Sequence, residues 1–132
     1  MPAMPTTLCH GDLHADNLLR GMGGEWIWAD WQEVRLGPGV DDLAFFWARA
    51  FAVAGSPPPF DAMVRAYSAE LQAVSGTQLE QERLAEALAW AELRSWLVDW
   101  PAYLGALPGA TVERVLLQID ALIDRLGIAP YG

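Results

Sequence analysis

Most of the residues that could do chemistry lie in one short polar segment near the start of the chain. Residues 8–19, LCHGDLHADNLL, contain both histidines of the 132-residue sequence, its only asparagine and two aspartates. The simplest interpretation is a turn stabilised by hydrogen bonds from Asp and Asn side chains to the backbone. In a chain that is 53% hydrophobic, however, this density of polar groups favours a site. Carboxylate and amide oxygens are ligands that Mg²⁺ uses when it also binds phosphates.

A predicted β-hairpin brings another carboxylate to this segment. Two apolar, aromatic-rich stretches flank the glycine-rich turn 21–24, a pattern typical of a hairpin. A turn centred between its last two glycines places Asn17 opposite Asp30, and opposed Cβ atoms lie about 4.5–5.5 Å apart. We therefore expect Asn17 and Asp30 to converge at the open end of the hairpin, with Asp12 in the loop that enters it.

Three segments, in this order and at these separations, resemble motifs of the aminoglycoside phosphotransferase family and its choline- and homoserine-kinase-like relatives. Residues 10–17 (HGDLHADN) resemble the catalytic loop, and residues 27–32 (IWADWQ) resemble the metal-binding end of a strand. Residues 37–44 (GPGVDDLA) resemble the segment that ends in Asp-Leu-Ala. Because these enzymes share the protein-kinase-like fold, the resemblance implies ATP-dependent phosphorylation of a hydroxyl group on a small molecule.

The resemblance implies a role for each matching residue. Asp12 matches the catalytic aspartate, which accepts or orients the substrate hydroxyl proton for attack on the γ-phosphate. Asn17 and Asp30 match the two ligands of Mg²⁺, so Mg²⁺ and ATP are the implied cofactors. His10 and Asp42 match residues that support the loop, Asp42 by accepting hydrogen bonds from the loop backbone.

Other polar residues have weaker assignments. His14 and Asp16 match variable positions, and we expect both to be solvated loop residues. The helical part of the family's fold builds the acceptor pocket, which makes Trp96, Asp99 and Trp100 candidate substrate-binding residues. The alternative for these three is an aromatic helix core with a solvated acid. The acidic balance of the chain suits an aminoglycoside-like or amino-alcohol acceptor, although solubility is the simpler explanation of the charge. Sugars and choline also remain open as acceptors.

The hydrophobic period predicts four helices after the hairpin. They are expected at residues 40–54, 61–74, 77–100 and 112–126, with a stiff proline-rich connector at 55–59. The third helix is apolar on two sides and is predicted to lie at the centre of the core. Thr77 and Glu80 form the predicted capping box of this third helix, and Pro101 is predicted to end it. The first helix has a predicted apolar stripe made of Leu43, Phe46, Trp47, Ala50, Phe51 and Ala54.

These elements predict a fold that is mainly α with a short β-hairpin. We expect a single domain over residues 1–132, with the catalytic loop and hairpin at 8–36 and a helical bundle at 40–127. The resemblance covers about residues 8–126 and implies the C-terminal, helical lobe of the protein-kinase-like fold.

The resemblance also implies that a lobe is missing. The family's N-terminal lobe supplies a nucleotide-covering loop and a lysine for the phosphates, whereas here only nine residues precede His10 and there is no lysine. We therefore expect either a truncated fragment or a naturally short protein. Because phosphoryl transfer depends on positioning and charge neutralisation, such a chain is expected to be weak or inactive alone.

The composition excludes several other classes of function. The net charge is −9 and the eight arginines are scattered singly, so nucleic acid is not an expected partner. No apolar run reaches the roughly 20 residues that cross a bilayer, and residues 1–5 lack the features of a secretory signal. A cytoplasmic protein without a membrane partner is predicted. The absence of lysine excludes Schiff-base chemistry and lysine-dependent phosphate motifs within the chain.

Two alternatives to a phosphotransferase lobe remain open. A non-catalytic remnant could serve as a binding or self-association module, as a homodimer or with a partner chain that supplies the missing lobe, since an exposed apolar lobe face would be buried by association. A metal-dependent phosphoesterase is the less favoured alternative. Asp12 and His14 have Asp-x-His ligand spacing, but such sites need further ligands and no histidine follows His14.

Overall fold

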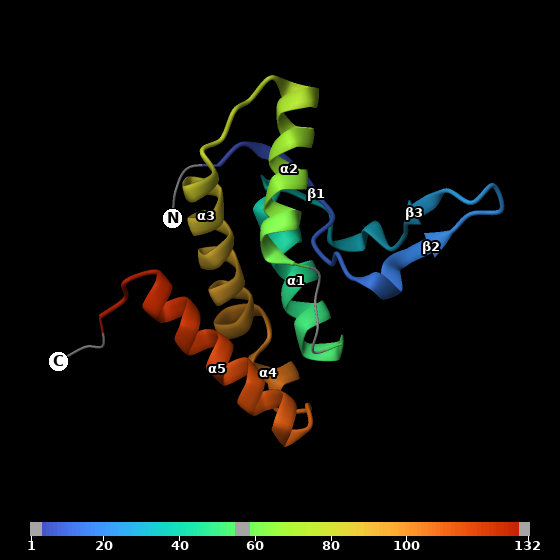
Figure 1. Cartoon of the computed structure of the whole chain (residues 1–132). Coiled ribbons are helices and arrows are strands. Elements are labelled where there is room, and N and C mark those ends of the chain that lie inside the picture. Colours follow the sequence, from blue (N-terminus) through green and yellow to red (C-terminus); the bar gives the residue numbers. More distant parts are fainter. Residues whose placement is uncertain (1–3, 55–58, 130–132) are drawn as a thin grey trace.

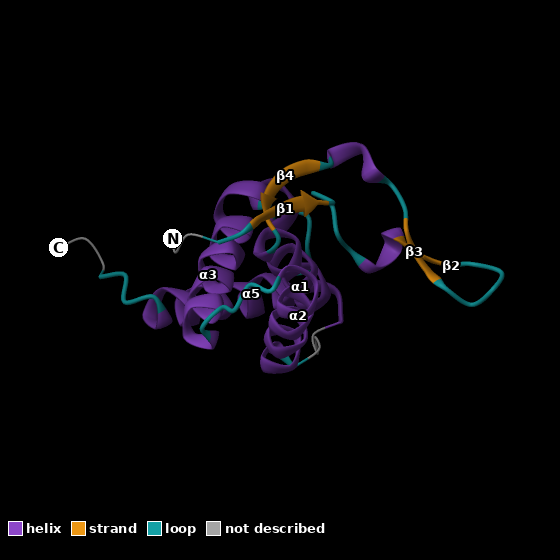
Figure 2. Ribbon diagram, turned by 90° about the horizontal axis from the view of Figure 1, so that it is seen from above, coloured by secondary structure: helices purple, strands orange, loops and turns teal. Residues whose placement is uncertain are grey.

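Helices and two small antiparallel sheets form the described part of the chain, residues 4–54 and 59–129 of the computed structural model (Figures 1 and 2). The predicted connector 55–59 lies outside these residues except for Pro59. The strands are β1 (Thr6–Cys9), β2 (Leu18–Arg20), β3 (Trp26–Trp28) and β4 (Arg35–Pro38). The helices are α1 (Val40–Ala54), α2 (Phe60–Ser75), α3 (Gln81–Arg94), α4 (Pro101–Leu104) and α5 (Gly109–Arg125), with 3₁₀ turns at Ala15–Asn17 and Trp31–Glu33 and a π-helical turn at Ser95–Asp99.

Helix α3 lies at the centre of the helical layer, as its two apolar sides predict. It packs against α1, α2 and α5, and its buried residues belong to both hydrophobic clusters of the core. The mainly α fold with a short hairpin is therefore confirmed. No helix among the described residues has the length and apolar character that a membrane span requires.

The buried face of α1 differs from the predicted stripe. Val40, Ala44, Ala48 and Ala52 are the buried apolar residues, whereas the predicted stripe that begins at Leu43 is only partly buried over its described side chains. Residues four apart lie on one face of a helix. Small side chains on this face let α1 approach α3 closely, and the larger aromatic residues pack around the contact.

The ends of α3 also differ from the prediction. The capping box is wrong, because α3 begins at Gln81 with Glu80 in the N-cap position and without a side-chain cap. At the other end, the Trp100 amide donates to the Ser95 carbonyl at 3.0 Å, which is the i to i+5 bond of a π-helical turn. Pro101 then occupies the first turn of α4, where its missing N–H costs no hydrogen bond.

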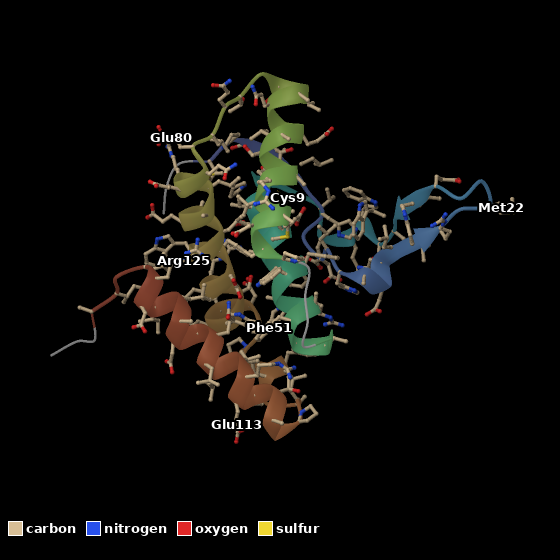
Figure 3. All side chains as sticks on the ribbon, in the orientation of Figure 1. Cys9, Met22, Phe51, Glu80, Glu113 and Arg125 are labelled. Atoms are coloured by element: carbon tan, nitrogen blue, oxygen red, sulfur yellow. The ribbon has the colours of Figure 1, made fainter. Side chains whose placement is uncertain are left out.

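The β2–β3 hairpin forms where predicted, with a register shifted by one residue. Leu18 pairs with Trp28 and Arg20 with Trp26, so the position opposite Asn17 is Ala29 and not Asp30. The reason is the turn, in which Gly24 donates to the Gly21 carbonyl and has a φ of 88°. This is a three-residue loop with a left-handed glycine in its last position, and its odd length centres the hairpin on one residue. Figure 3 shows Met22 at the tip, far from the helices.

A second sheet, β1–β4, was not predicted. Thr6 pairs with Pro38 and Cys9 with Arg35, and Figure 2 shows this sheet beside the helices, at the base of the projecting hairpin. Both strands are four residues long, and Gly37-Pro38 indicates a chain break more strongly than a strand. Pro38 is tolerated because it stands at the end of an edge strand. The sheet brings the start of the polar segment beside the start of α1.

Candidate active site

The backbone of the polar segment is fixed by one side chain from α1. The Asp42 carboxylate accepts hydrogen bonds from the His10 amide at 2.6 Å and the Gly11 amide at 3.0 Å. Each oxygen binds one donor, so the carboxylate orients two consecutive peptide groups. Because Asp42 lies in the first turn of α1, this contact joins the loop to the start of the helical layer.

His10 connects the loop to the end of β3. Its ring is buried, its Nε2 lies 2.8 Å from the Ala29 carbonyl oxygen, and its Nδ1 accepts from the Asp12 amide at 3.3 Å. Since Nδ1 acts as the acceptor, the hydrogen of the neutral ring belongs on Nε2. The ring also packs on Trp31 with centroids 4.6 Å apart. His10 therefore holds Asp12 and the residue before Asp30 at a fixed separation.

The close approach of the loop to the 3₁₀ turn Trp31–Glu33 requires glycine at position 11. Gly11 has a φ of 86°, and a Cβ at this position would overlap the Glu33 carbonyl group. Both the backbone conformation and the space exclude an ordinary side chain.

Cys9 lies directly before this loop and is fully buried. Its Sγ lies 3.5 Å from the Pro38 carbonyl oxygen. Burial raises the pKa of the thiol, and the negative charge of Asp42 raises it further. This environment keeps the thiol protonated, which fits a packing role.

Asp12 and Asn17 are in direct contact. The Asn17 side-chain amide donates to the Asp12 carbonyl oxygen at 3.0 Å and lies 3.4 Å from Asp12 Oδ2. The 3₁₀ turn that ends at Asn17 makes this possible, with the Asn17 amide bonded to the His14 carbonyl at 3.0 Å. Because Nδ2 points to Asp12, the amide oxygen of Asn17 remains available to a ligand.

Asp30 lies at the same end of the hairpin. The Ala29 amide donates to the Asn17 carbonyl oxygen at 2.8 Å, so Asp30 comes one residue after the position opposite Asn17. Its φ of 63° makes Asp30 the non-glycine residue with a left-handed backbone in the described part of the chain. Asp is one of the few residues that tolerate this conformation, which here precedes the 3₁₀ turn Trp31–Glu33.

Asn17 and Asp30 are the residues that could hold Mg²⁺ arriving together with phosphates. Such an ion uses one or two protein carboxylates, and phosphate oxygens and water fill its remaining positions. An amide oxygen and an exposed carboxylate meet that requirement. Over residues 4–54 and 59–129, no group of three or more His, Cys, Asp or Glu side chains is arranged to hold a metal ion.

A cavity of about 620 Å³ opens beside Asp12. Asp99, a candidate substrate-binding residue, lies in its wall. The other two candidates, Trp96 and Trp100, are instead buried in the hydrophobic core, where their rings meet at 5.4 Å and 88°. The aromatic-core alternative therefore describes these two tryptophans. The lining residues are Gly11, Asp12, Glu33, Arg35, Asp41, Asp42, Phe45, Arg94, Ser95, Val98 and Asp99.

Sequence reasoning missed the charged cluster in the wall of this cavity. Asp41 is buried, and its Oδ2 lies 3.4 Å from Arg35 Nη2 and 3.2 Å from Arg94 Nη2. Arg94 Nε also lies 3.8 Å from Asp99. These residues come from β4, α1, α3 and the π-helical turn, so only the folded chain brings them together. Asp41 neighbours Asp42 in sequence, and the pair of acids at the start of α1 is the local signal.

The surroundings of His14 also differ from the prediction of a solvated loop residue. Its side chain is only 12% exposed and lies between Asp12 and Asp16. His14 has an extended backbone, with a φ of −144° and a ψ of 165°. Acidic residues two positions away on either side are the signal that could have indicated this arrangement.

Comparison with known proteins gives one finding. A family model described as "Phosphotransferase enzyme family" matches residues 1–77, more than half of the chain, and includes all three motif segments and the loop contacts described above. Neither the curated proteins nor the solved structures gave a significant match.

Proposed function

This chain belongs to the phosphotransferase enzyme family, and from that premise we propose that it is the catalytic lobe of an ATP-dependent kinase for a small-molecule hydroxyl group. The observation that carries the proposal is the position of Asp12. Asp12 lines the cavity, while its backbone amide and Oδ2 are held by His10 and Asn17. A carboxylate oriented at the wall of a cavity can accept the proton of a bound hydroxyl group.

The proposed reaction needs little covalent chemistry from the protein. The acceptor oxygen bonds to the γ-phosphorus, the bond from that phosphorus to the bridging oxygen breaks, and ADP leaves with that oxygen. Asp12 accepts the hydroxyl hydrogen. Asn17 and Asp30 would hold Mg²⁺, which supplies charge neutralisation at the phosphate oxygens. Asp42 and His10 keep the loop in place.

The charges of the cavity support a cationic acceptor. Five carboxylates line it against two arginines, and both arginines are paired with Asp41. Negative charge in a cavity raises the local concentration of cationic ligands. We therefore propose an aminoglycoside-like or amino-alcohol acceptor, whose ammonium groups would face Asp99 and Glu33.

Part of the nucleotide site must come from elsewhere. The chain has no lysine, and its two cavity arginines are engaged by Asp41. We propose that a further lobe or a partner chain supplies the nucleotide clamp and that the 132 residues alone are weakly active or inactive. Nucleotide affinity is therefore a better test than turnover.

Calorimetric titration of ATP, with and without Mg²⁺, tests the metal and nucleotide assignment. Asp30→Asn removes the carboxylate and keeps a residue that tolerates the left-handed backbone. We expect Mg²⁺-dependent binding to weaken on the order of tenfold in this variant, about 1.4 kcal/mol. Asp120→Asn, an exposed change on α5, is the matched control and should bind as the native chain does. Undetectable binding to the native chain, or equal binding by both, would contradict the proposal.

The acceptor class has a separate test. Binding of a polyamino sugar should exceed that of a neutral sugar of similar size, and the difference should shrink as salt screens the cavity charges. Glu33→Gln combined with Asp99→Asn should weaken binding of the amino sugar and leave the neutral sugar unaffected. Equal affinity for both sugars would count against a cationic acceptor.

An exposed apolar surface favours the self-association alternative. Leu8 and Leu36 are cross-strand partners in the β1–β4 sheet and are 61% and 76% exposed. Leu19 and Ile27 form a second exposed cross-strand pair on the hairpin. A second copy of the chain or the partner lobe could bury these pairs.

Sedimentation over a wide concentration range tests this alternative, with Leu8→Ser and Leu36→Ser combined as the variant that should stay monomeric. A native chain that is monomeric at every concentration excludes self-association.

A further inference from the structure

The ring of His14 lies between the carboxylates of Asp12 and Asp16. Its Nε2 is 3.4 Å from Asp12 Oδ2, and its Nδ1 is 3.5 Å from Asp16 Oδ2. A carboxylate can only accept a hydrogen bond, so whichever ring nitrogen serves a carboxylate must carry the hydrogen. With a neutral ring, one of the two aspartates receives it.

The surroundings of the two aspartates differ. Asp16 is 80% exposed, so water hydrates it, and Arg49 Nη2 lies 3.6 Å from its Oδ2. The Asp12 side chain is 31% exposed and faces no guanidinium within ion-pair distance in the described part of the chain. His14 Nδ1, on the Asp16 side, is buried and makes no hydrogen bond to a described residue. Asp12 therefore gains more from the ring hydrogen than Asp16 does.

The two oxygens of Asp12 are used unequally. Oδ2 is approached by both Asn17 Nδ2 and His14 Nε2, each at 3.4 Å. Among the described residues, no hydrogen-bond or ion-pair partner is found for Oδ1. Two side-chain nitrogens that approach one oxygen from different positions restrict rotation of the carboxylate and leave the other oxygen for a ligand in the cavity.

We propose that His14 is a positioning residue, whose Nε2–H donates to Asp12 Oδ2 so that Oδ1 faces the acceptor hydroxyl. The orientation of Oδ1 toward an acceptor hydroxyl rests on the proposed function. The contact itself does not depend on nucleotide or acceptor, so it can be tested even if the chain binds neither.

Nitrogen NMR of ¹⁵N-histidine-labelled chain provides the main test, because the sequence has only two histidines. Spectra are recorded at a pH at which both rings are neutral. We expect His14 to be the Nε2–H tautomer in the native chain. Asp12→Ala should shift the His14 nitrogens toward those of a free imidazole, while Asp16→Ala should leave the tautomer unchanged.

His10 reports whether the loop is still folded. Its ring binds the Ala29 carbonyl and the Asp12 backbone amide, and Asp12→Ala retains both groups. Unchanged His10 signals would therefore show that a shift of His14 is a local effect. The proposal is overturned if His14 is the Nδ1–H tautomer, or if Asp16→Ala changes it and Asp12→Ala does not.

The effect on Asp12 can be measured by carbon NMR of its carboxyl group. His14→Ala should shift this signal, and His14→Gln should restore it at least in part, because the glutamine amide supplies an N–H donor. A purely structural role for His14 would not make the signal depend on a donor. An Asp12 signal that is identical in the native chain and both variants would contradict the positioning role. Loss of Mg²⁺-ATP binding would instead contradict the proposed function and leave this result intact.

Discussion

Asp42 holds the backbone of His10 with a 2.6 Å hydrogen bond, although the two residues are 32 positions apart in the sequence. The other oxygen of the same carboxylate holds the Gly11 amide. The position of the polar loop at residues 10–17 therefore depends on the first turn of α1. Any change that moves the start of this helix also moves Asp12, two residues after His10.

Asp42→Asn tests this dependence. An amide side chain has one acceptor oxygen, so one of the two loop amides loses its partner and faces an N–H group. We expect the free energy of unfolding to fall by about 1–3 kcal/mol, which is the cost of a buried unsatisfied polar group. Urea denaturation measures this difference. Asp120→Asn, which changes an exposed carboxylate on α5, should stay within about 0.5 kcal/mol of the native chain.

Gly11→Ala tests the close approach of the loop to the Glu33 carbonyl. The methyl group must displace this carbonyl, and the backbone must keep a left-handed φ that alanine disfavours. We expect a loss of at least about 1–3 kcal/mol in the free energy of unfolding. Gly109→Ala is the matched control, because nothing lies within 4 Å of the added methyl group. A loss in the control as large as in Gly11→Ala would show that the contact with Glu33 is unimportant.

Local signals in the sequence predicted the helices well and their packing less well. Val40 after Gly37-Pro38-Gly39 correctly marks the start of α1, and Gly127, with a φ of 64°, follows the end of α5. Periodicity identifies which faces are apolar. It does not say that α1 turns its alanines toward α3, because that choice depends on how closely the two helices approach.

The same limit applies to the site. The loop motif and the predicted hairpin together placed Asp12, Asn17 and Asp30 in one region, yet a one-residue error in the turn shifted the predicted pairing. The acidic neighbours of His14 in sequence indicate its contacts with Asp12 and Asp16, but not the ion pair of Asp16 with Arg49, because Arg49 comes from α1. The local sequence pattern predicted which polar residues lie close together. Contacts between segments distant in sequence decide which of them are shielded from solvent.

Glu92 makes the stability of the chain depend on pH. It is buried in α3, where its Oε1 accepts from Gln118 Nε2 at 3.0 Å and from Trp96 Nε1 at 3.4 Å. Burial raises the pKa of this carboxyl above its ordinary value, and these hydrogen bonds reduce the shift only in part. The folded state therefore holds the proton more tightly than the unfolded state, so the contribution of Glu92 to stability falls as pH rises from about 4.3, the ordinary pKa of glutamate, through the raised value.

Glu92→Gln removes this ionisation and keeps an acceptor oxygen. Relative to the native chain, the variant should gain stability with rising pH, by about 1.4 kcal/mol for each unit by which the pKa is raised. Glu86→Gln, at an exposed position of the same helix, should show no such trend. Denaturation at several pH values between 4 and 8 measures both, and a flat difference for Glu92→Gln would show that the carboxyl does not titrate differently on folding.

Cys9 should resist thiol reagents while the chain is folded. The side chain is fully buried in β1, and its raised pKa lowers the fraction of reactive thiolate. Reaction with a disulfide reagent should be slower than in urea by on the order of tenfold or more, because each unit of pKa removes about nine-tenths of the thiolate and burial blocks access to the remainder. The matched control combines Leu8→Cys with Cys9→Ala and moves the thiol to the exposed face of the same strand, where it should react rapidly. Equal native-state rates for the two chains would mean that β1 opens freely. The sheet that brings the polar loop beside the start of α1 would then be absent in solution.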